Sequence, residues 1–118
     1  MAEIAELMRA NLLGVFNERD PARRREVIAA TYAPDVEFAD PEGSVTGHDA
    51  LDAKAQGLLD ASPDLVFSPA GSVRVAGDLG YLPWQLGPEG AAPVVRGVDI
   101  ALVADGRIAR LYTLLLTD

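Results

Sequence analysis

Two aspartates of this chain lie where an apolar pattern would direct their carboxylates inward. In the segment DVEFAD, alternation places Asp40 on the same side of a predicted strand as the apolar residues before it. Asp99 stands between Val98 and Ile100 in an apolar stretch, where an acid is costly to bury without a purpose. A carboxylate near a substrate can take and return a proton, so both are candidate general acids or bases. The alternatives are that Asp40 caps the Asp-Pro turn and that Asp99 is satisfied by the backbone or by Arg96.

The composition removes several other kinds of chemistry. The chain has no cysteine, which excludes disulfides, thiolate nucleophiles and Cys-ligated metals. Its single histidine, His48, cannot build a multi-histidine metal site within one chain. Phosphate-binding glycine loops and the serine-hydrolase motif are absent. We therefore expect no metal and no cofactor, and we expect any catalysis to come from Asp, Glu, Tyr, Arg or amide side chains.

Length and charge limit the domain organisation and the partners. The 118 residues suffice for one domain with a core, so we treat 1–118 as a single domain. The net charge of -8 disfavours nucleic acid and anionic membranes as partners. No apolar stretch approaches the ~20 residues that span a bilayer, and the acidic start is not typical of a signal peptide. We expect a cytoplasmic protein.

The first half of the chain is patterned for helices. Apolar residues recur at helical spacing over about 2–18, and the Asp20-Pro21 pair signals a second helix that reaches about Tyr32. A third helix is predicted around 51–59. The Arg23–Arg25 run is interpreted as a solvated helix face.

The second half is patterned for strands separated by short turns. The predicted strands cover about 64–75, 79–87, 93–104 and 107–117. Such turns favour an antiparallel meander. Helices followed by strands predict an α+β domain with the helices on one sheet face.

The last two predicted strands are apolar on both faces. This holds for VVRGVDIALV and for RIARLYTLLLTD. The helices can cover only one face of an antiparallel sheet, and the other face should then be polar. We therefore expect a homodimer through the outer sheet face. The alternative is a highly curved sheet whose ends wrap onto each other.

Three segments in order, YAPDVEFADPEGSVTGHDAL, SPDLVF and RGVDIALVADGRIARLY, resemble the nuclear transport factor 2-like superfamily. More narrowly, they resemble the SnoaL-like polyketide cyclases and the ketosteroid isomerases. The resemblance covers essentially the whole chain. It implies a cone-shaped, cystatin-like fold in which a curved, mostly antiparallel sheet wraps around three N-terminal helices and leaves an apolar pocket. This fold hosts enzymes and binding modules alike, so it does not by itself decide the function.

The resemblance also implies roles for single residues. Asp40, in ADPEGS, occupies the place of the general-base aspartate of ketosteroid isomerases, and Asp99 occupies the place of their second acid. In SnoaL-like cyclases a single late-strand aspartate, similar in place to Asp99, is the proposed acid/base. Ketosteroid isomerases also carry a tyrosine in the first helix, near the place of Leu12 here. Tyr32 is the first tyrosine of this chain and the candidate replacement.

We interpret the chain as a cofactor-independent acid/base enzyme of isomerase or cyclase type, with Asp40 and Asp99 as its catalytic residues. Its ligand would be an apolar small molecule, such as a ketone or a polyketide-type substrate. The alternative is a non-catalytic dimeric domain that binds an apolar ligand or a protein partner. The expected pocket lining is aromatic and aliphatic and comprises Tyr32, Trp84, Leu12, Phe16, Phe38, Phe67 and Leu114.

Overall fold

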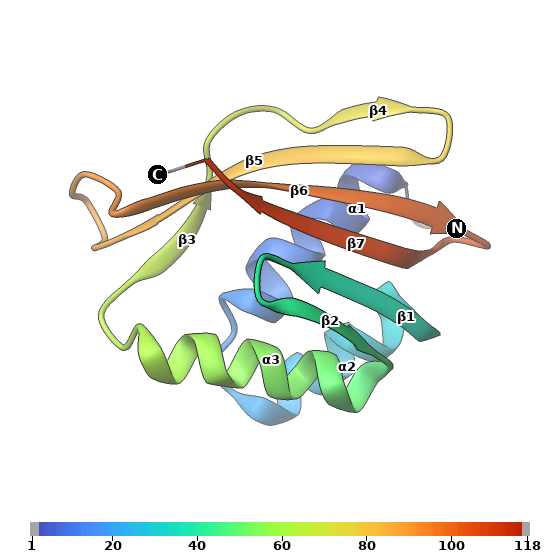
Figure 1. Cartoon of the computed structure of the whole chain (residues 1–118), viewed down its shortest axis with the longest axis horizontal. Helices are drawn as coiled ribbons and strands as arrows, with labels where there is room; N and C mark the ends of the chain where they lie inside the picture. Colours follow the sequence, from blue (N-terminus) through green and yellow to red (C-terminus); the bar gives the residue numbers. More distant parts are fainter. Residues whose placement is uncertain (1–2, 117–118) are drawn as a thin grey trace.

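The computed structural model describes residues 3–116, which form helices followed by a sheet (Figure 1). The helical elements are α1 (Ile4–Arg9), the π-helical segment η1 (Ala10–Phe16), α2 (Pro21–Thr31) and α3 (His48–Ala61). The strands are β1 (Tyr32–Asp40), β2 (Gly43–Thr46), β3 (Val66–Pro69), β4 (Arg74–Ala76), β5 (Leu79–Gly87), β6 (Val95–Ala104) and β7 (Arg107–Leu115).

The strands form one seven-stranded sheet in the order β2-β1-β7-β6-β5-β3, and β4 also pairs with β5. β5, β6 and β7 make the predicted antiparallel meander. β1 runs parallel to β7, which brings the end of the chain beside the first strand. The helices lie on one side of this sheet (Figure 1), so the α+β prediction is confirmed.

The structure refines two of the predicted helices and divides one predicted strand. The first helix is not uniform, because it changes from α1 to the wider π-helical η1 at Ala10. Tyr32 begins β1 and does not belong to the second helix, although its backbone N–H still donates to the carbonyl of Ile28. The single strand expected over 64–75 is two strands, β3 and β4, which pair with opposite ends of β5. The limits of β3 and β4 are therefore set by the segments of β5 with which they pair.

The core lies between the helices and the inner sheet face. α1 and η1 contribute the largest share, because Leu7, Met8, Leu12, Val15 and Phe16 are all buried. Buried side chains from β1, β5, β6 and β7 of the sheet pack against them. This packing fixes η1 against the strands that carry the candidate catalytic residues.

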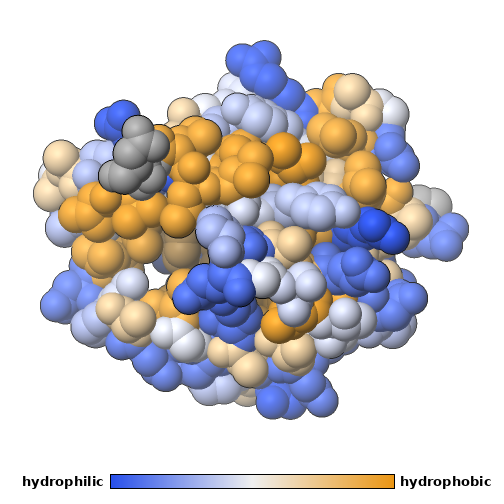
Figure 2. Space-filling model, in the orientation of Figure 1, coloured by the Kyte–Doolittle hydropathy of each residue, from blue (hydrophilic) through white to orange (hydrophobic). Residues whose placement is uncertain are grey.

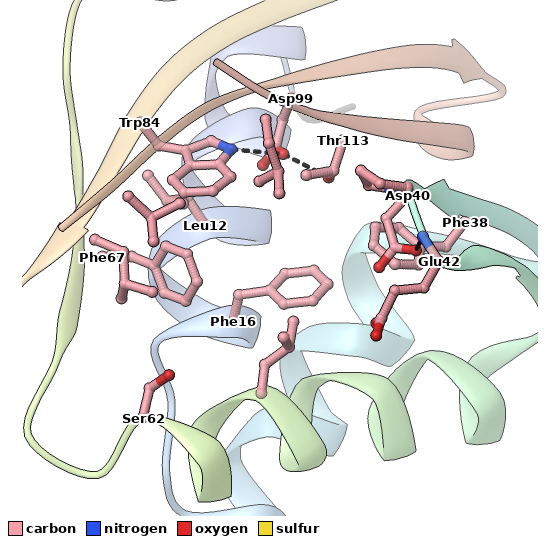
Figure 3. Close-up of a pocket in the computed structure, with 15 residues that line it drawn as sticks. Leu12, Phe16, Phe38, Asp40, Glu42, Ser62, Phe67, Trp84, Asp99 and Thr113 are labelled. Atoms are coloured by element: carbon pink, nitrogen blue, oxygen red, sulfur yellow. Dashed lines mark hydrogen bonds between the residues drawn. The ribbon is translucent and has the colours of Figure 1, made fainter. Parts of the chain in front are cut away.

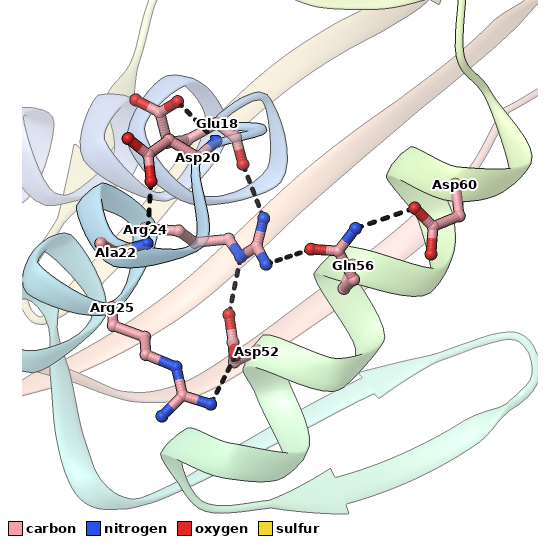
Figure 4. Close-up of polar contacts among 8 residues, drawn as sticks. All are labelled: Glu18, Asp20, Ala22, Arg24, Arg25, Asp52, Gln56 and Asp60. Atoms are coloured by element: carbon pink, nitrogen blue, oxygen red, sulfur yellow. Dashed lines mark hydrogen bonds and ion pairs between the residues drawn. The ribbon is translucent and has the colours of Figure 1, made fainter.

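A buried ion pair ties α2 to α3, and it corrects the prediction that all three arginines of 23–25 face solvent (Figure 4). Arg24 is only 1% exposed, and its Nε donates to Asp52 Oδ1 at 2.6 Å. Its Nη atoms donate to the Glu18 carbonyl at 2.8 Å and to Gln56 Oε1 at 2.5 Å. A buried guanidinium needs this full set of acceptors. Arg24 therefore holds the two helices in register.

The outer sheet face carries an apolar patch in which Tyr112 and Leu114 are exposed, while Val98 is buried among its neighbours. Figure 2 shows apolar side chains gathered over the meander, on the face turned away from α1. The strand register aligns two rows across β5, β6 and β7, and we call these six residues the outer-face patch: Tyr81, Ile100 and Tyr112, then Pro83, Val98 and Leu114. Leu114 is 50% exposed. None of the helices within residues 3–116 has the length and apolar character to cross a bilayer.

Candidate functional site

A pocket of about 400 Å³ lies between the helices and the inner sheet face (Figure 3). Its wall is mostly apolar and draws on η1, α3 and five strands. The lining residues are Leu12, Phe16, Phe38, Asp40, Pro41, Glu42, Leu58, Ser62, Phe67, Trp84, Leu86, Val95, Asp99, Thr113 and Leu115. An apolar cavity with a few convergent polar groups is the usual form of a small-molecule site.

The Asp99 carboxylate lies in this pocket and accepts three hydrogen bonds. Trp84 Nε1 donates to Asp99 Oδ1 at 2.9 Å, and Thr113 Oγ1 donates to the same oxygen at 2.7 Å. Asn11 Nδ2 donates to Asp99 Oδ2 at 2.8 Å. Thr113 on β7 lies directly opposite Asp99. Trp84 on β5 lies opposite Gly97, two residues before Asp99 on β6. The carboxylate is thus held from β5, β7 and η1 at once.

Burial dominates the electrostatics of Asp99. The residue is 4% exposed, and loss of water raises the pKa of its carboxyl from 3.8 to about 6. The hydrogen bonds from Thr113, Trp84 and Asn11 oppose this shift, because they stabilise the charged form. The residue is therefore mostly ionised at neutral pH, and it gains a proton more readily than an ordinary aspartate does.

Asn11 is oriented by a second buried residue. The hydroxyl of Tyr32 donates to Asn11 Oδ1, which directs the amide nitrogen of Asn11 at Asp99. Both residues are fully buried. Burial, with a smaller contribution from Asp99, raises the pKa of Tyr32 well above its ordinary value, so its hydroxyl stays a neutral donor. Tyr32, Asn11 and Asp99 form one chain of hydrogen bonds that ends at the pocket.

Asp40 also lines the pocket, but both of its oxygens are already bound. Oδ1 accepts the backbone N–H of Glu42 at 2.9 Å, which is the turn cap given above as the alternative role of Asp40. Oδ2 lies 2.9 Å from Lys54 Nζ, which also contacts Glu42 Oε1 at 2.5 Å. The group Asp40, Glu42 and Lys54, here called the acidic rim, borders the apolar part of the pocket.

An arginine from the turn after η1 fixes the opposite rim. Arg19 donates to the carbonyls of Leu59, Ser62 and Leu65 at 3.2, 2.8 and 3.1 Å. These include the unpaired carbonyls expected at the C-terminal end of α3. Arg19 thereby positions Ser62, which lines the pocket.

The structure brings most of the predicted site residues together. Asp40, Asp99, Leu12, Phe16, Phe38, Phe67 and Trp84 all line the pocket. The ring of Phe67 meets Trp84 edge to face, with centroids 5.2 Å apart. Two residues do not line it: Tyr32 lies behind Asn11, and Leu114 points to the outer face because its neighbours Thr113 and Leu115 point inward. These two assignments are corrected.

Asn11 and Thr113 contact the candidate base but were not singled out from the sequence. Asn11 follows Leu7 by four residues and precedes Val15 by four, so an amide stands within the buried helix stripe. A polar residue in such a stripe usually has a buried partner. Thr113 lies opposite Asp99 in the last hairpin, which simple counting across the ADGR turn would have indicated.

The comparisons with known proteins agree with this architecture. Residues 10–111 match the family model described as the SnoaL-like domain. A crystal structure from Agrobacterium tumefaciens, provisionally named an isomerase of the SnoaL-like family, superposes with a TM-score of 0.88 at 23% identity, over 95% of this chain and 96% of that one. No curated protein matches the chain.

Two further solved structures carry names of enzyme classes, also given provisionally. One, from Sinorhizobium meliloti, is named a polyketide cyclase; its TM-score is 0.73 at 22% identity, over 92% of this chain and 93% of that one. Another, from Kribbella flavida, is named a ketosteroid isomerase; its TM-score is 0.69 at 20% identity, over 97% and 78% of the two chains. The fold is thus of the nuclear transport factor 2-like, cystatin-like type. With the family model matching most of its length, the chain belongs to the SnoaL-like domain family.

Proposed function

We propose that this protein is a cofactor-independent isomerase or cyclase that uses Asp99 to move a proton on an apolar, ketone-containing or polyketide-type substrate. One observation carries the proposal: a buried carboxylate with three donors lies in a mostly apolar pocket. Buried ionisable groups with a specific set of partners in a cavity are typical of catalytic sites. The names of the structural neighbours favour the same class of reaction.

The proposed chemistry needs one carboxylate. Asp99 takes a proton from the carbon next to a substrate carbonyl, and the electron pair of the C–H bond moves to the carbonyl oxygen to form an enolate. In an isomerisation, protonated Asp99 returns the proton to a different carbon. In a cyclisation, the enolate carbon attacks a second carbonyl of the same molecule, and Asp99 protonates the alkoxide that results. A pKa of about 6 suits a group that must both take and give a proton near neutral pH.

The structure favours Asp99 over Asp40 as the base. Both oxygens of Asp40 are bound, one by the turn and one by Lys54. With both oxygens engaged, Asp40 has no free lone pair directed at a ligand in the pocket. The donors beside Asp99, the Trp84 indole and the Thr113 hydroxyl, are also in use. The substrate should therefore be a ketone whose enolate is stabilised by its own conjugation.

The test is exchange of a carbon-bound proton. The probe is 2-tetralone, an apolar bicyclic ketone, and deuterium uptake from D₂O is followed by NMR. Wild-type protein should accelerate exchange above the buffer rate. Asp99→Asn should lose about 100-fold or more of that acceleration, whereas Asp40→Asn should keep most of it. Full activity in Asp99→Asn would exclude the mechanism, and exchange at the buffer rate in wild type would favour the non-catalytic binding domain.

We also propose that the outer-face patch is the contact with a second copy of this chain. The two aligned rows of apolar residues continue across three adjacent strands, and Leu114 is half exposed there. Monomeric proteins rarely leave an extended apolar patch in water. A two-fold axis through the meander would place the same rows against each other, as a symmetric dimer requires.

Sedimentation velocity and light scattering test the dimer. Wild type should be dimeric, and Leu114→Glu should be monomeric because it places charges at the contact. Val75→Glu is the matched control: Val75 is 53% exposed on β4, outside the outer-face patch. A monomeric wild type, or a Leu114→Glu variant that stays dimeric, would contradict the interface.

A further inference from the structure

We infer that the pocket selects apolar ligands without negative charge and rejects those that end in a carboxylate, sulfonate or phosphate. This inference rests on the proposed function, because it concerns the substrate class of the same site. It is carried by the signs of the charges around the pocket and by the hydrogen bonds that already engage all but one of the side-chain donors lining it.

All charged residues that line the pocket are acidic. They are Asp40 and Glu42 at the rim and Asp99 on the sheet (Figure 3). The nearby cation, Lys54, contacts both rim carboxylates, so the acidic rim has one positive and two negative charges and a net charge of -1. An anionic ligand would therefore be repelled both by the acidic rim and by the Asp99 carboxylate inside the pocket.

The donors near the pocket are occupied as well. The indole N–H of Trp84, the hydroxyl of Thr113 and the amide of Asn11 all donate to Asp99. Arg19 lies near Ser62, but its guanidinium donates to three carbonyls at the end of α3. An anion that leaves water needs donors or a cation to replace its hydration. Among the described lining residues, only the Ser62 hydroxyl, at the rim, is not already committed to another side chain.

An uncharged ligand has no such penalty. The remaining wall is built from Leu12, Phe16, Phe38, Pro41, Leu58, Phe67, Leu86, Val95 and Leu115. These side chains bury apolar ligand surface, which is the favourable term in binding. A ketone or an ester can therefore bind against this apolar wall. A carboxylic acid of similar size, which is ionised at neutral pH, cannot replace its lost hydration there.

Two fluorescent probes of nearly the same shape test the inference. N-phenyl-1-naphthylamine is neutral, and 8-anilinonaphthalene-1-sulfonate carries one sulfonate on the same ring system. Their affinities are measured by fluorescence titration. Like charges brought together at a contact are costly, so the sulfonate should bind about 10-fold or more weakly than the neutral probe.

Two variants with the same change in net charge separate the rim from the overall charge of the chain. Glu42→Gln leaves Lys54 paired only with Asp40, so the rim loses its net negative charge. The variant should bind the sulfonate probe more tightly, which reduces the difference in affinity between the two probes. Glu89→Gln removes an exposed acid outside this pocket and should leave that difference unchanged. Equal effects of the two variants would overturn the role of the acidic rim.

A third variant shows where the probes bind. Leu58→Trp fills the pocket and should abolish binding of the neutral probe. Equal affinity of both probes for wild type, with binding lost in Leu58→Trp, would overturn the charge selection and leave proton transfer by Asp99 intact. Neutral-probe binding that survives Leu58→Trp would overturn the inference, because the probe would then lie outside the pocket. Failure of the proposed function is read separately, from the deuterium exchange of the Asp99→Asn variant.

Discussion

Replacing Asp99 with asparagine should change the pH dependence of stability in a direction that the structure dictates. Burial raises the pKa of Asp99 to about 6 from its ordinary 3.8, so between these values the folded protein holds a proton that the unfolded chain has released. The free energy of unfolding contributed by this group therefore falls as pH rises through this window and is level above it. At about 1.4 kcal/mol for each pKa unit, the total is about 3 kcal/mol.

The Asp99→Asn variant lacks this titration. Its side chain offers one carbonyl oxygen to donors from Asn11, Trp84 and Thr113, so it also loses hydrogen bonding, at about 1 kcal/mol for each bond. That loss does not depend on pH over the window. The stability of the variant minus that of wild type should therefore rise by about 2.4 kcal/mol between pH 4 and pH 7, with the rest of the total below pH 4. The other carboxylates cancel in the difference.

Urea unfolding followed by far-UV circular dichroism at four pH values measures this difference. The single tryptophan gives a second readout, because the Trp84 indole donates to Asp99. Its fluorescence in the folded protein should titrate with a midpoint near pH 6 in wild type and lose that step in the variant. A stability difference that stays constant with pH, or an unchanged tryptophan titration in Asp99→Asn, would refute the argument.

Three further substitutions have defined outcomes. Thr113→Val removes a hydrogen bond that lowers the pKa of Asp99, so the pH midpoint of deuterium exchange should move upward; a downward shift would contradict this. Arg24→Met breaks the buried ion pair and should cost about 3 kcal/mol in urea unfolding, whereas Arg23→Met, at an exposed site, should cost almost nothing. Gly97→Ala places a Cβ 2.3 Å from the indole, so it should destabilise the protein by about 2 kcal/mol and abolish the tryptophan titration.

The parts of the fold that local patterns control were predicted well. The antiparallel meander follows from short turns between apolar runs, and the start of α2 follows from the Asp20 cap, whose carboxylate accepts the N–H of Ala22. β1 begins at Tyr32, before the predicted strand segment DVEFAD, because its first residue pairs in parallel with β7 at the other end of the chain. The residues around position 32 do not indicate that they pair with a strand near residue 110.

The candidate site shows the same division. Asp99 could be identified from the sequence because an acid within an apolar strand is unusual. Arg24 was assigned to solvent because a run of three arginines is usually a solvated helix face, and only the packing of α3 brings Asp52 and Gln56 to it. Side-chain roles that depend on a second, distant element were the ones that sequence reasoning missed.

Asn11 explains how this chain differs from the ketosteroid isomerases that it resembles. The first helix has no tyrosine, and Tyr32 does not reach the pocket in its place. The Tyr32 hydroxyl supports Asn11, and Asn11 donates to Asp99. The polar group of the first helix is therefore directed at the Asp99 carboxylate, which we propose as the base. In the proposed mechanism, these donors stabilise the ionised carboxylate and stabilisation of the enolate is left to the substrate, so we expect a conjugated polyketide-type ketone to react faster than a simple ketone.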